Sequence, residues 1–223
     1  MSIEIPEDNR FVGMRRAMIE QIREAGVHDL DLLQLFDLIH RHHFLPEGVW
    51  NRAYDDAPIP IGYGQTASQP SLQARYLSVL AVQKGDVVLE LGTGSGFLTA
   101  LLSERAERVY SVERVRELSV RARGVLDQMK VRNVALQVGD GTIGWRKYAP
   151  YDVIVVSAAS PSTPQALLDQ LADGGRMLIP IGTRERQQLT LVRKTGFAVT
   201  EEVIEEVTFV PLLGRFAFQP ETD

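Results

Sequence analysis

A glycine-rich run between residues 90 and 97 contains the residues best suited to hold a small ligand. It reads Glu90-Leu91-Gly92-Thr93-Gly94-Ser95-Gly96-Phe97. It directly follows an apolar run that predicts a strand, and it opens a run that predicts a helix. Glycine lets the backbone turn tightly and approach a ligand with no Cβ atom in the way. A dinucleotide-binding loop would read G-x-G-x-x-G, but here the third glycine comes one residue early and Phe97 stands in its place.

The spacing E-x-G-x-G-x-G resembles instead the S-adenosyl-L-methionine (AdoMet) motif of class I methyltransferases. AdoMet carries no phosphate, so the loop needs no phosphate cradle, whereas its ammonium group favours a nearby carboxylate network that Glu90 could support. The resemblance implies AdoMet as cofactor, S-adenosyl-L-homocysteine as its product, and no metal. The cofactor-binding residues predicted in this run are Glu90, Gly92, Thr93, Gly94, Ser95 and Gly96.

Two further acids end the next two predicted strands. Glu113 ends the second, where a carboxylate can accept both ribose hydroxyl protons. Asp140, within Gly139-Asp140-Gly141, ends the third and could accept from an adenine amino group, while Gly141 leaves room for the ring. Each acid alone could be a solvated strand end, and the glycines alone a plain turn. In this order, the three together favour an AdoMet site.

The elements that must position these residues alternate between strands and helices. Short, nearly continuous apolar runs predict parallel strands buried on both faces. The expected fold is therefore α/β, with a doubly wound, mostly parallel sheet of the Rossmann-like type. Strands are predicted at 87–91, 109–113, 134–138, 153–156, 176–180 and 188–192, and helices at 71–81, 97–105, 116–130 and 163–171. Glu201-Glu202 and Glu205-Glu206 are expected on a solvated face.

Upstream of this core, three- and four-residue apolar spacing predicts helices between about residues 9 and 43, with a break at Gly26. A proline- and glycine-rich stretch from 46 to 70 predicts an ordered loop that serves the site. We divide the chain into residues 1–70, with helices and a substrate-site loop, and residues 71–223, the AdoMet-binding core, both within one compact unit. His40-Arg41-His42-His43 lacks a metal-ligand spacing and is expected to form a solvated helix end.

Composition narrows the class of protein. The 223 residues include no cysteine, which excludes disulfides and thiolate metal sites. Their net charge of -5 argues against nucleic-acid partners. The acidic segment Met1–Asp8 shows no secretory signal, and no apolar run approaches the ~20 residues that a membrane-spanning helix needs. We expect a cytoplasmic protein that does not act at a membrane and is a monomer.

The segment from Pro60 to Pro70, with its pattern G-x-G-Q-T-x-S-Q-P, gives a more specific resemblance. Together with Gly139-Asp140-Gly141 and Phe209-Val210-Pro211-Leu212, it is similar to protein-L-isoaspartate O-methyltransferases from about residue 10 to 215. The resemblance implies methyl transfer from AdoMet to the carboxylate of L-isoaspartyl, and possibly D-aspartyl, residues in damaged proteins or peptides, which initiates repair. Beside the site, the chain differs from the residues usual in this family, and these differences bear on substrate preference and activity. They lie at Ala67, Ser71-Leu72-Gln73, Phe97-Leu98 and Leu213.

A carboxylate acceptor is already ionised at neutral pH, so the reaction needs proximity and exclusion of water rather than a general base. The resemblance assigns the active site to Ser68, and we predict that Thr66, Ser68 and Gln69 bind the substrate. Because Pro70 opens the next helix, we expect Ser68 and nearby backbone N–H groups to hold the substrate carboxylate. The alternative is that Ser68 or Thr66 only caps that helix.

Three other functions stay open at this point. A class I methyltransferase could act on a different acceptor, although Ser157-Ala158-Ala159-Ser160 lacks the N/D-P-P-Y/F signature of enzymes that methylate amino groups of nucleic acids. A nicotinamide-dependent oxidoreductase is disfavoured by the early third glycine. The third alternative is an AdoMet-binding homologue with little turnover. Assays of AdoMet binding and of methyl transfer distinguish these three alternatives.

Overall fold

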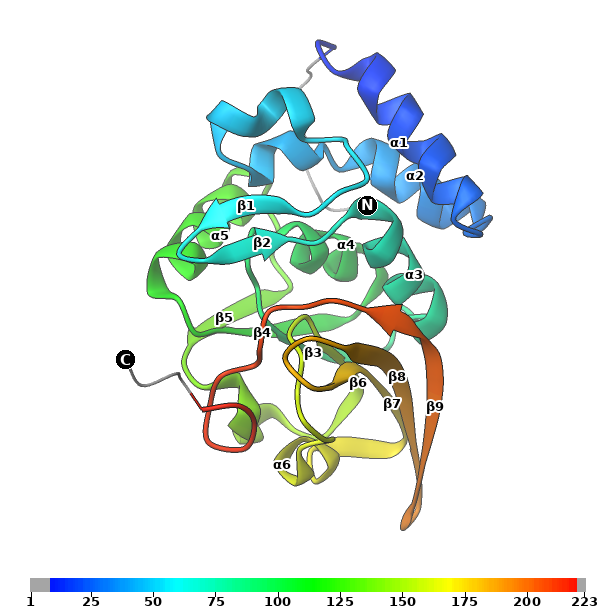
Figure 1. Ribbon diagram of the computed structural model, residues 1–223, viewed down its shortest axis with the longest axis vertical. Coiled ribbons are helices and arrows are strands. Elements are labelled where there is room, and N and C mark those ends of the chain that lie inside the picture. Colours follow the sequence, from blue (N-terminus) through cyan, green and yellow to red (C-terminus); the bar gives the residue numbers. More distant parts are fainter. Residues whose placement is uncertain (1–8, 220–223) are drawn as a thin grey trace.

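A seven-stranded sheet forms the centre of the protein in a computed structural model that describes residues 9–219 (Figure 1). Its strand order is β5-β4-β3-β6-β7-β8-β9, and the five strands from β5 to β7 run parallel, whereas β8 and β9 run antiparallel. The predicted α/β fold with a mostly parallel sheet is confirmed. The strands are β3 (Val87–Leu91), β4 (Arg108–Glu113), β5 (Val134–Val138), β6 (Tyr151–Val156), β7 (Leu171–Gly182), β8 (Gln187–Thr195) and β9 (Ala198–Val207).

Helices cover both faces of this sheet because successive strand residues point to opposite sides. Val88 and Val153 belong to one buried cluster, whereas Leu89 and Ile154 belong to the other. The first cluster packs under α3 (Pro70–Leu80), α4 (Phe97–Arg105) and α5 (Arg116–Gln128), and the second under the short α6 (Gln165–Leu168) (Figure 1).

The N-terminal segment forms a further layer over α3, α4 and α5 (Figure 1). Side chains such as Met18, Ile22 and Phe36 join the same buried cluster as α4 and the sheet. The division at residue 70 stays a prediction, and this cluster extends across it. The elements are α1 (Val12–Glu24), α2 (Leu30–Leu38), the 3-10 turns η1 (Arg41–Phe44) and η2 (Glu47–Arg52), and a hairpin of β1 (Ile59–Gly62) and β2 (Gln65–Ala67).

The expectation of a solvated helix end at His40–His43 is wrong. Helix α2 ends at Leu38, and His42 in the following turn is fully buried. The His42 Nδ1 atom lies 2.6 Å from the Tyr54 hydroxyl, and its ring lies 4.6 Å from that of Phe11. These partners come from distant parts of the chain, so the local spacing of the histidines could not reveal them.

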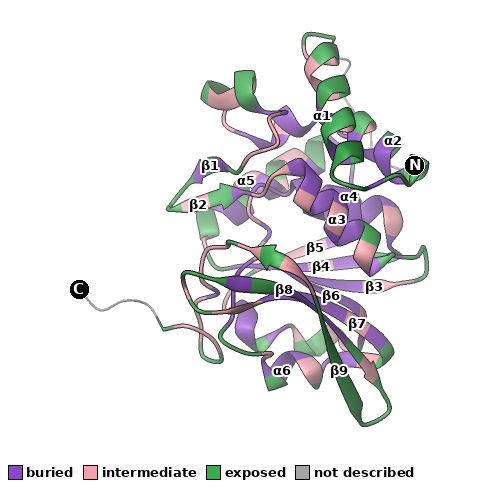
Figure 2. Cartoon of the chain, turned by 45° about the vertical axis from the view of Figure 1, so that its right-hand side comes forward, coloured by how far each residue is buried: buried purple, intermediate pink, exposed green. Residues whose placement is uncertain are grey.

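The C-terminal third differs from the prediction in two places. The helix expected at 163–171 is only the single turn α6, because β7 already begins at Leu171. No strand was expected at β9, whose glutamates suggested only a solvated face. Figure 2 shows β9 as the exposed edge of the sheet, where charged residues are tolerated and discourage pairing with other strands.

Two expectations concern membranes and targeting. Within residues 9–219, no helix combines the length and apolar character needed to cross a bilayer. The acidic segment Met1–Asp8 lies outside the described residues.

Candidate active site

A cavity opens at the carboxyl ends of β3, β4 and β6, where the chain order reverses between β3 and β6. Ligands of doubly wound sheets bind at such a switch point. The glycine loop and the β2 strand both line this cavity. Its lining residues are Gln65–Ser68, Gln73, Leu91–Ser95, Leu98, Val112–Val115, Leu118, Gly141, Ser157, Ala158 and Val210–Leu213.

The glycine loop turns sharply at three glycines with positive φ. Gly92, Gly94 and Gly96 have φ values of 93°, 52° and 87°, a region that other residues adopt only with strain. A Cβ atom at Gly96 would lie 3.0 Å from the Cβ of Ala122 in α5, so this glycine also allows close helix packing. The loop is therefore a shaped concave surface that a ligand can approach closely.

Replacing Gly96 by alanine should lower the free energy of unfolding by about 1–2 kcal/mol, because φ and the contact with Ala122 both become strained. AdoMet affinity should fall with it, since the loop must shift. Chemical unfolding and equilibrium binding measure the two effects. Gly124→Ala in α5 is the matched control: it meets no atom within 4 Å, and it should stabilise the helix by up to ~1 kcal/mol. Equal behaviour of the two variants would contradict the role of the Gly96 conformation.

Glu113 lies at the end of β4, and its side chain lines the cavity. One carboxylate oxygen accepts the Gly94 N–H at 2.9 Å and the other accepts the Val115 N–H at 2.8 Å. These bonds fix the carboxylate, which has about four lone-pair positions in all. Two of these positions stay available for a pair of ligand hydroxyl groups.

Glu90 lies behind the loop rather than on the cavity wall. It is fully buried, and its Oε2 atom accepts the Thr99 hydroxyl at 2.6 Å, while Oε1 has no hydrogen-bond partner among the described residues. Burial raises the pKa of Glu90 to about 7, against the opposing effect of the nearby Ser111 and Thr99 hydroxyls. Its predicted role toward the ammonium group is therefore at most indirect, through the loop.

The raised pKa of Glu90 predicts a pH-dependent stability. Between the ordinary pKa of 4.5 and about 7, the folded protein keeps a proton that the unfolded chain releases, so the free energy of unfolding falls as pH rises. Glu90→Gln removes this titration. The free energy of unfolding of the variant minus that of the wild type should therefore be larger above pH 7 than below pH 4.5, by on the order of 3 kcal/mol. Urea unfolding at a series of pH values measures this. Parallel stability curves for the two proteins would contradict the prediction.

Asp140 accepts hydrogen bonds from Thr142 close by in the chain and from the C-terminal segment. Its Oδ1 accepts the backbone N–H and the hydroxyl of Thr142, at 2.8 and 2.7 Å, and its Oδ2 accepts the Arg215 N–H at 2.8 Å. Burial acts to raise the pKa of Asp140, but these hydrogen bonds and the Arg215 charge outweigh it and lower the pKa. Gly141 lines the cavity, whereas Asp140 lies beside it. One lone-pair position of Asp140 is left for an adenine amino group.

The β1–β2 hairpin carries Thr66 and Ser68 over the glycine loop. Arg121 of α5 donates to the Ile61 carbonyl at 2.8 Å, and the Ile61 side chain faces Gly94. Thr66 and Ser68 line the same cavity as the loop. Gln69 does not; its side-chain amide donates to the Ser71 hydroxyl at 3.1 Å.

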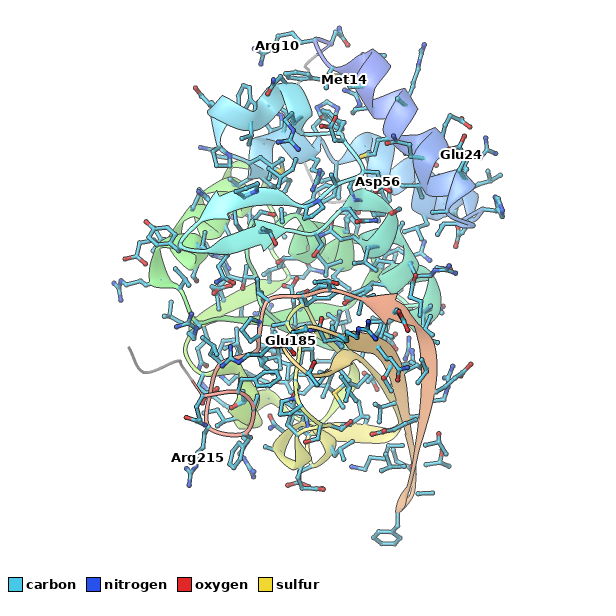
Figure 3. All side chains as sticks on the ribbon, in the orientation of Figure 1. Arg10, Met14, Glu24, Asp56, Glu185 and Arg215 are labelled. Carbon is cyan, nitrogen blue, oxygen red and sulfur yellow. The ribbon has the colours of Figure 1, made fainter. Side chains whose placement is uncertain are left out.

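The first turn of α3 excludes the capping alternative. The N-cap residue is Gln69 and it makes no side-chain cap, with Pro70 as the first helical residue. The Ser71 N–H donates instead to Asp56 Oδ1 at 2.8 Å, and Figure 3 labels Asp56 beside this helix start. Ser68 is thus free of a capping role. One backbone N–H that we expected to hold the substrate carboxylate is already taken by Asp56.

The C-terminal segment Val210–Leu213 forms part of the cavity wall, which no local sequence pattern predicted. The Leu212 N–H donates to the Ala159 carbonyl at 2.7 Å, and the Ala159 N–H donates to Val210 at 2.9 Å. These bonds hold the segment beside the end of β6. The run Phe209–Leu212 contributed to the family resemblance, but its spacing alone indicated no function.

Comparison with known proteins identifies the family. The model of the protein-L-isoaspartate(D-aspartate) O-methyltransferase family matches residues 14–217. A protein-L-isoaspartate O-methyltransferase of Syntrophotalea carbinolica is 44% identical over 211 residues, which cover 94% of this chain and 97% of the relative. The chain belongs to this family.

Solved structures of protein-L-isoaspartate O-methyltransferases share the fold. One of them superimposes with a TM-score of 0.81 at 29% identity, covering 91% of this chain and 67% of that chain. A putative enzyme of the family from Plasmodium falciparum, in complex with S-adenosyl-L-homocysteine, gives a TM-score of 0.78 at 23% identity and covers 89% and 98% of the two chains. The predicted methyltransferase class is confirmed by the family, and the nicotinamide alternative is set aside.

Proposed function

We propose that this chain transfers a methyl group from AdoMet to the free carboxylate of L-isoaspartyl residues, and of D-aspartyl residues where they fit, in damaged proteins or peptides. The resulting ester initiates repair. The observation that carries the proposal is the shared cavity: the segment Thr66–Ser68, which distinguishes this family from other methyltransferases, lines the same cavity as the glycine loop.

The residues on the cavity wall fit AdoMet. Glu113 offers its two remaining lone-pair positions to the ribose hydroxyls, and the turns at Gly92, Gly94 and Gly96 leave space for the methionine part. Thr93 and Ser95 belong to the same turn, and Gly141 borders the space for the adenine ring. When bound, AdoMet supplies an electrophilic methyl group on a sulfonium. Among the described residues, no group of His, Asp and Glu side chains is arranged to hold a metal.

Ser68 is proposed as the residue that touches the acceptor carboxylate. Its hydroxyl has no hydrogen-bond partner among residues 9–219, although the side chain lines the cavity. Thr66, two residues earlier on β2, and Gln69 would contact the substrate around it. The chemistry asks only that one carboxylate oxygen be aligned with the methyl group and that water be kept out.

We further propose that the protein acts as a cytoplasmic monomer on peptide substrates, without nucleic-acid or membrane partners. The net charge of -5 and the absence of cysteine support this proposal. Size-exclusion chromatography with light scattering, and cell fractionation, would test the two finer points.

The deciding experiment measures methyl transfer from labelled AdoMet to an isoaspartyl peptide, with the matched aspartyl peptide as control. Labelling of the isoaspartyl peptide alone is expected. Equal labelling of both peptides would indicate a different acceptor, and AdoMet binding without labelling would indicate a homologue that has little turnover.

A further inference from the structure

A buried arginine lies directly behind the proposed acceptor residue. Arg41, in the turn η1, has no exposed surface. Its Nη1 atom donates to the Ala53 carbonyl at 2.6 Å, and its Nη2 atom donates to the Ser68 carbonyl at 2.9 Å. The third nitrogen, Nε, has no hydrogen-bond partner among the described residues.

The guanidinium also reaches the cofactor side of the site. Its central carbon lies 6.0 Å from the centre of the Phe97 ring, and Phe97 is the first residue of α4, directly after the glycine loop. One side chain thus lies between Ser68, directly after β2, and the first residue of the helix that the loop opens.

A charge in this position is costly and is only partly compensated. Carbonyl groups satisfy hydrogen bonds without neutralising the cation, and burial lowers the pKa of Arg41 to about 10, although the charges of Asp56, Tyr54 and Asp55 oppose this. Asp56 is the same residue that caps α3 at Ser71 (Figure 3). A hydrophobic side chain could fill this space, but it would leave the Ala53 and Ser68 carbonyls without their donors, so packing alone does not account for an arginine.

We propose that Arg41 is a positioning residue for methyl transfer: it fixes the Ser68 backbone relative to the AdoMet loop and places a positive charge behind the acceptor carboxylate. The inference rests on the proposed function for the identity of the acceptor. The guanidinium does not line the cavity and acts through Ser68. Its charge favours an anionic acceptor without a direct contact to the reacting oxygen.

Arg41→Met, Arg41→Lys and the control Ile22→Ala test this inference. Ile22 is a fully buried residue of α1 in the same N-terminal layer, so its truncation loosens that layer without touching Ser68. Arg41→Met should lower kcat/KM for the isoaspartyl peptide about 30-fold. Arg41→Lys should recover only a factor of about three to ten of this loss, because it restores the charge but only one of the two hydrogen bonds. The dissociation constant of AdoMet should change less than threefold, because Arg41 does not line the cavity.

Three results would overturn the inference. The first is a loss of kcat/KM in Arg41→Met no larger than in Ile22→Ala. The second is a lysine variant no more active than the methionine variant. If Arg41→Met does not fold, the third result decides: a kcat/KM of Arg41→Lys equal to that of the wild type.

Amide hydrogen exchange of residues 65–69 separates this inference from the proposed function. Exchange there should become faster in Arg41→Met and not in Ile22→Ala, whether or not isoaspartyl peptides are the acceptors. Unchanged exchange in Arg41→Met would overturn the positioning role, whereas a wild type without isoaspartyl activity would overturn only the proposed function.

Discussion

Replacing Glu113 by glutamine should weaken AdoMet binding about 100-fold, since hydrogen bonds to a charged group contribute about 1.5–3 kcal/mol each. The carboxylate accepts the N–H groups of Gly94 and Val115, and we propose that it also accepts two ribose hydroxyls. The amide nitrogen of glutamine cannot accept a hydrogen bond, so one backbone N–H loses its partner and one ribose contact is lost with it. Isothermal titration with AdoMet measures the effect.

Glu117→Gln is the matched control for this variant. Glu117 lies exposed in the first turn of α5, four residues along the chain, and loses the same charge. Its AdoMet affinity should stay within about twofold of the wild type, because an exposed surface charge contributes little. Similar affinities for the two variants would contradict a contact between Glu113 and the ribose.

Replacing Ser68 by alanine should lower kcat/KM for the isoaspartyl peptide about 10- to 100-fold, the loss expected for one hydrogen bond to a carboxylate. The melting temperature and the AdoMet affinity should not change, because the Ser68 hydroxyl has no partner among the described residues and Gln69 is the N-cap of α3. Steady-state kinetics, calorimetry and AdoMet titration measure the three quantities.

Ser78→Ala, on the exposed face of the same helix, controls for the loss of a serine hydroxyl near the hairpin. It should leave kcat/KM unchanged. A Ser68→Ala enzyme with full activity and a lowered melting temperature would return Ser68 to a purely structural role.

The parts of the fold and site that follow a local pattern could be predicted. The buried strands follow from their continuous apolar runs, and the glycine loop follows from its spacing after β3. Glu113 belongs to the same group: the carboxyl ends of parallel strands meet at one edge of the sheet, so an acid that ends β4 lies beside the loop after β3.

The parts that could not be predicted depend on contacts between residues far apart in the chain. The two partners of Asp140 are Thr142, its neighbour, and Arg215, 75 residues along the chain, and no local pattern connects Asp140 with Arg215. The burial of Arg41 likewise depends on carbonyls at Ala53 and Ser68. β9 was missed because glutamates are rare in strands, and they are tolerated here only because β9 is an edge.

Asp56 already accepts the Ser71 N–H at the start of α3, so an acceptor carboxylate beside Ser68 would receive few direct donors. A carboxylate oxygen surrounded by donors is a poor nucleophile, because its lone pairs are withdrawn from the attack. An oxygen held by a single hydroxyl keeps its reactivity. Weak binding of the ground state also avoids stabilising the bound substrate, which would raise the barrier to methyl transfer. The arrangement favours loose capture of the acceptor followed by rapid displacement.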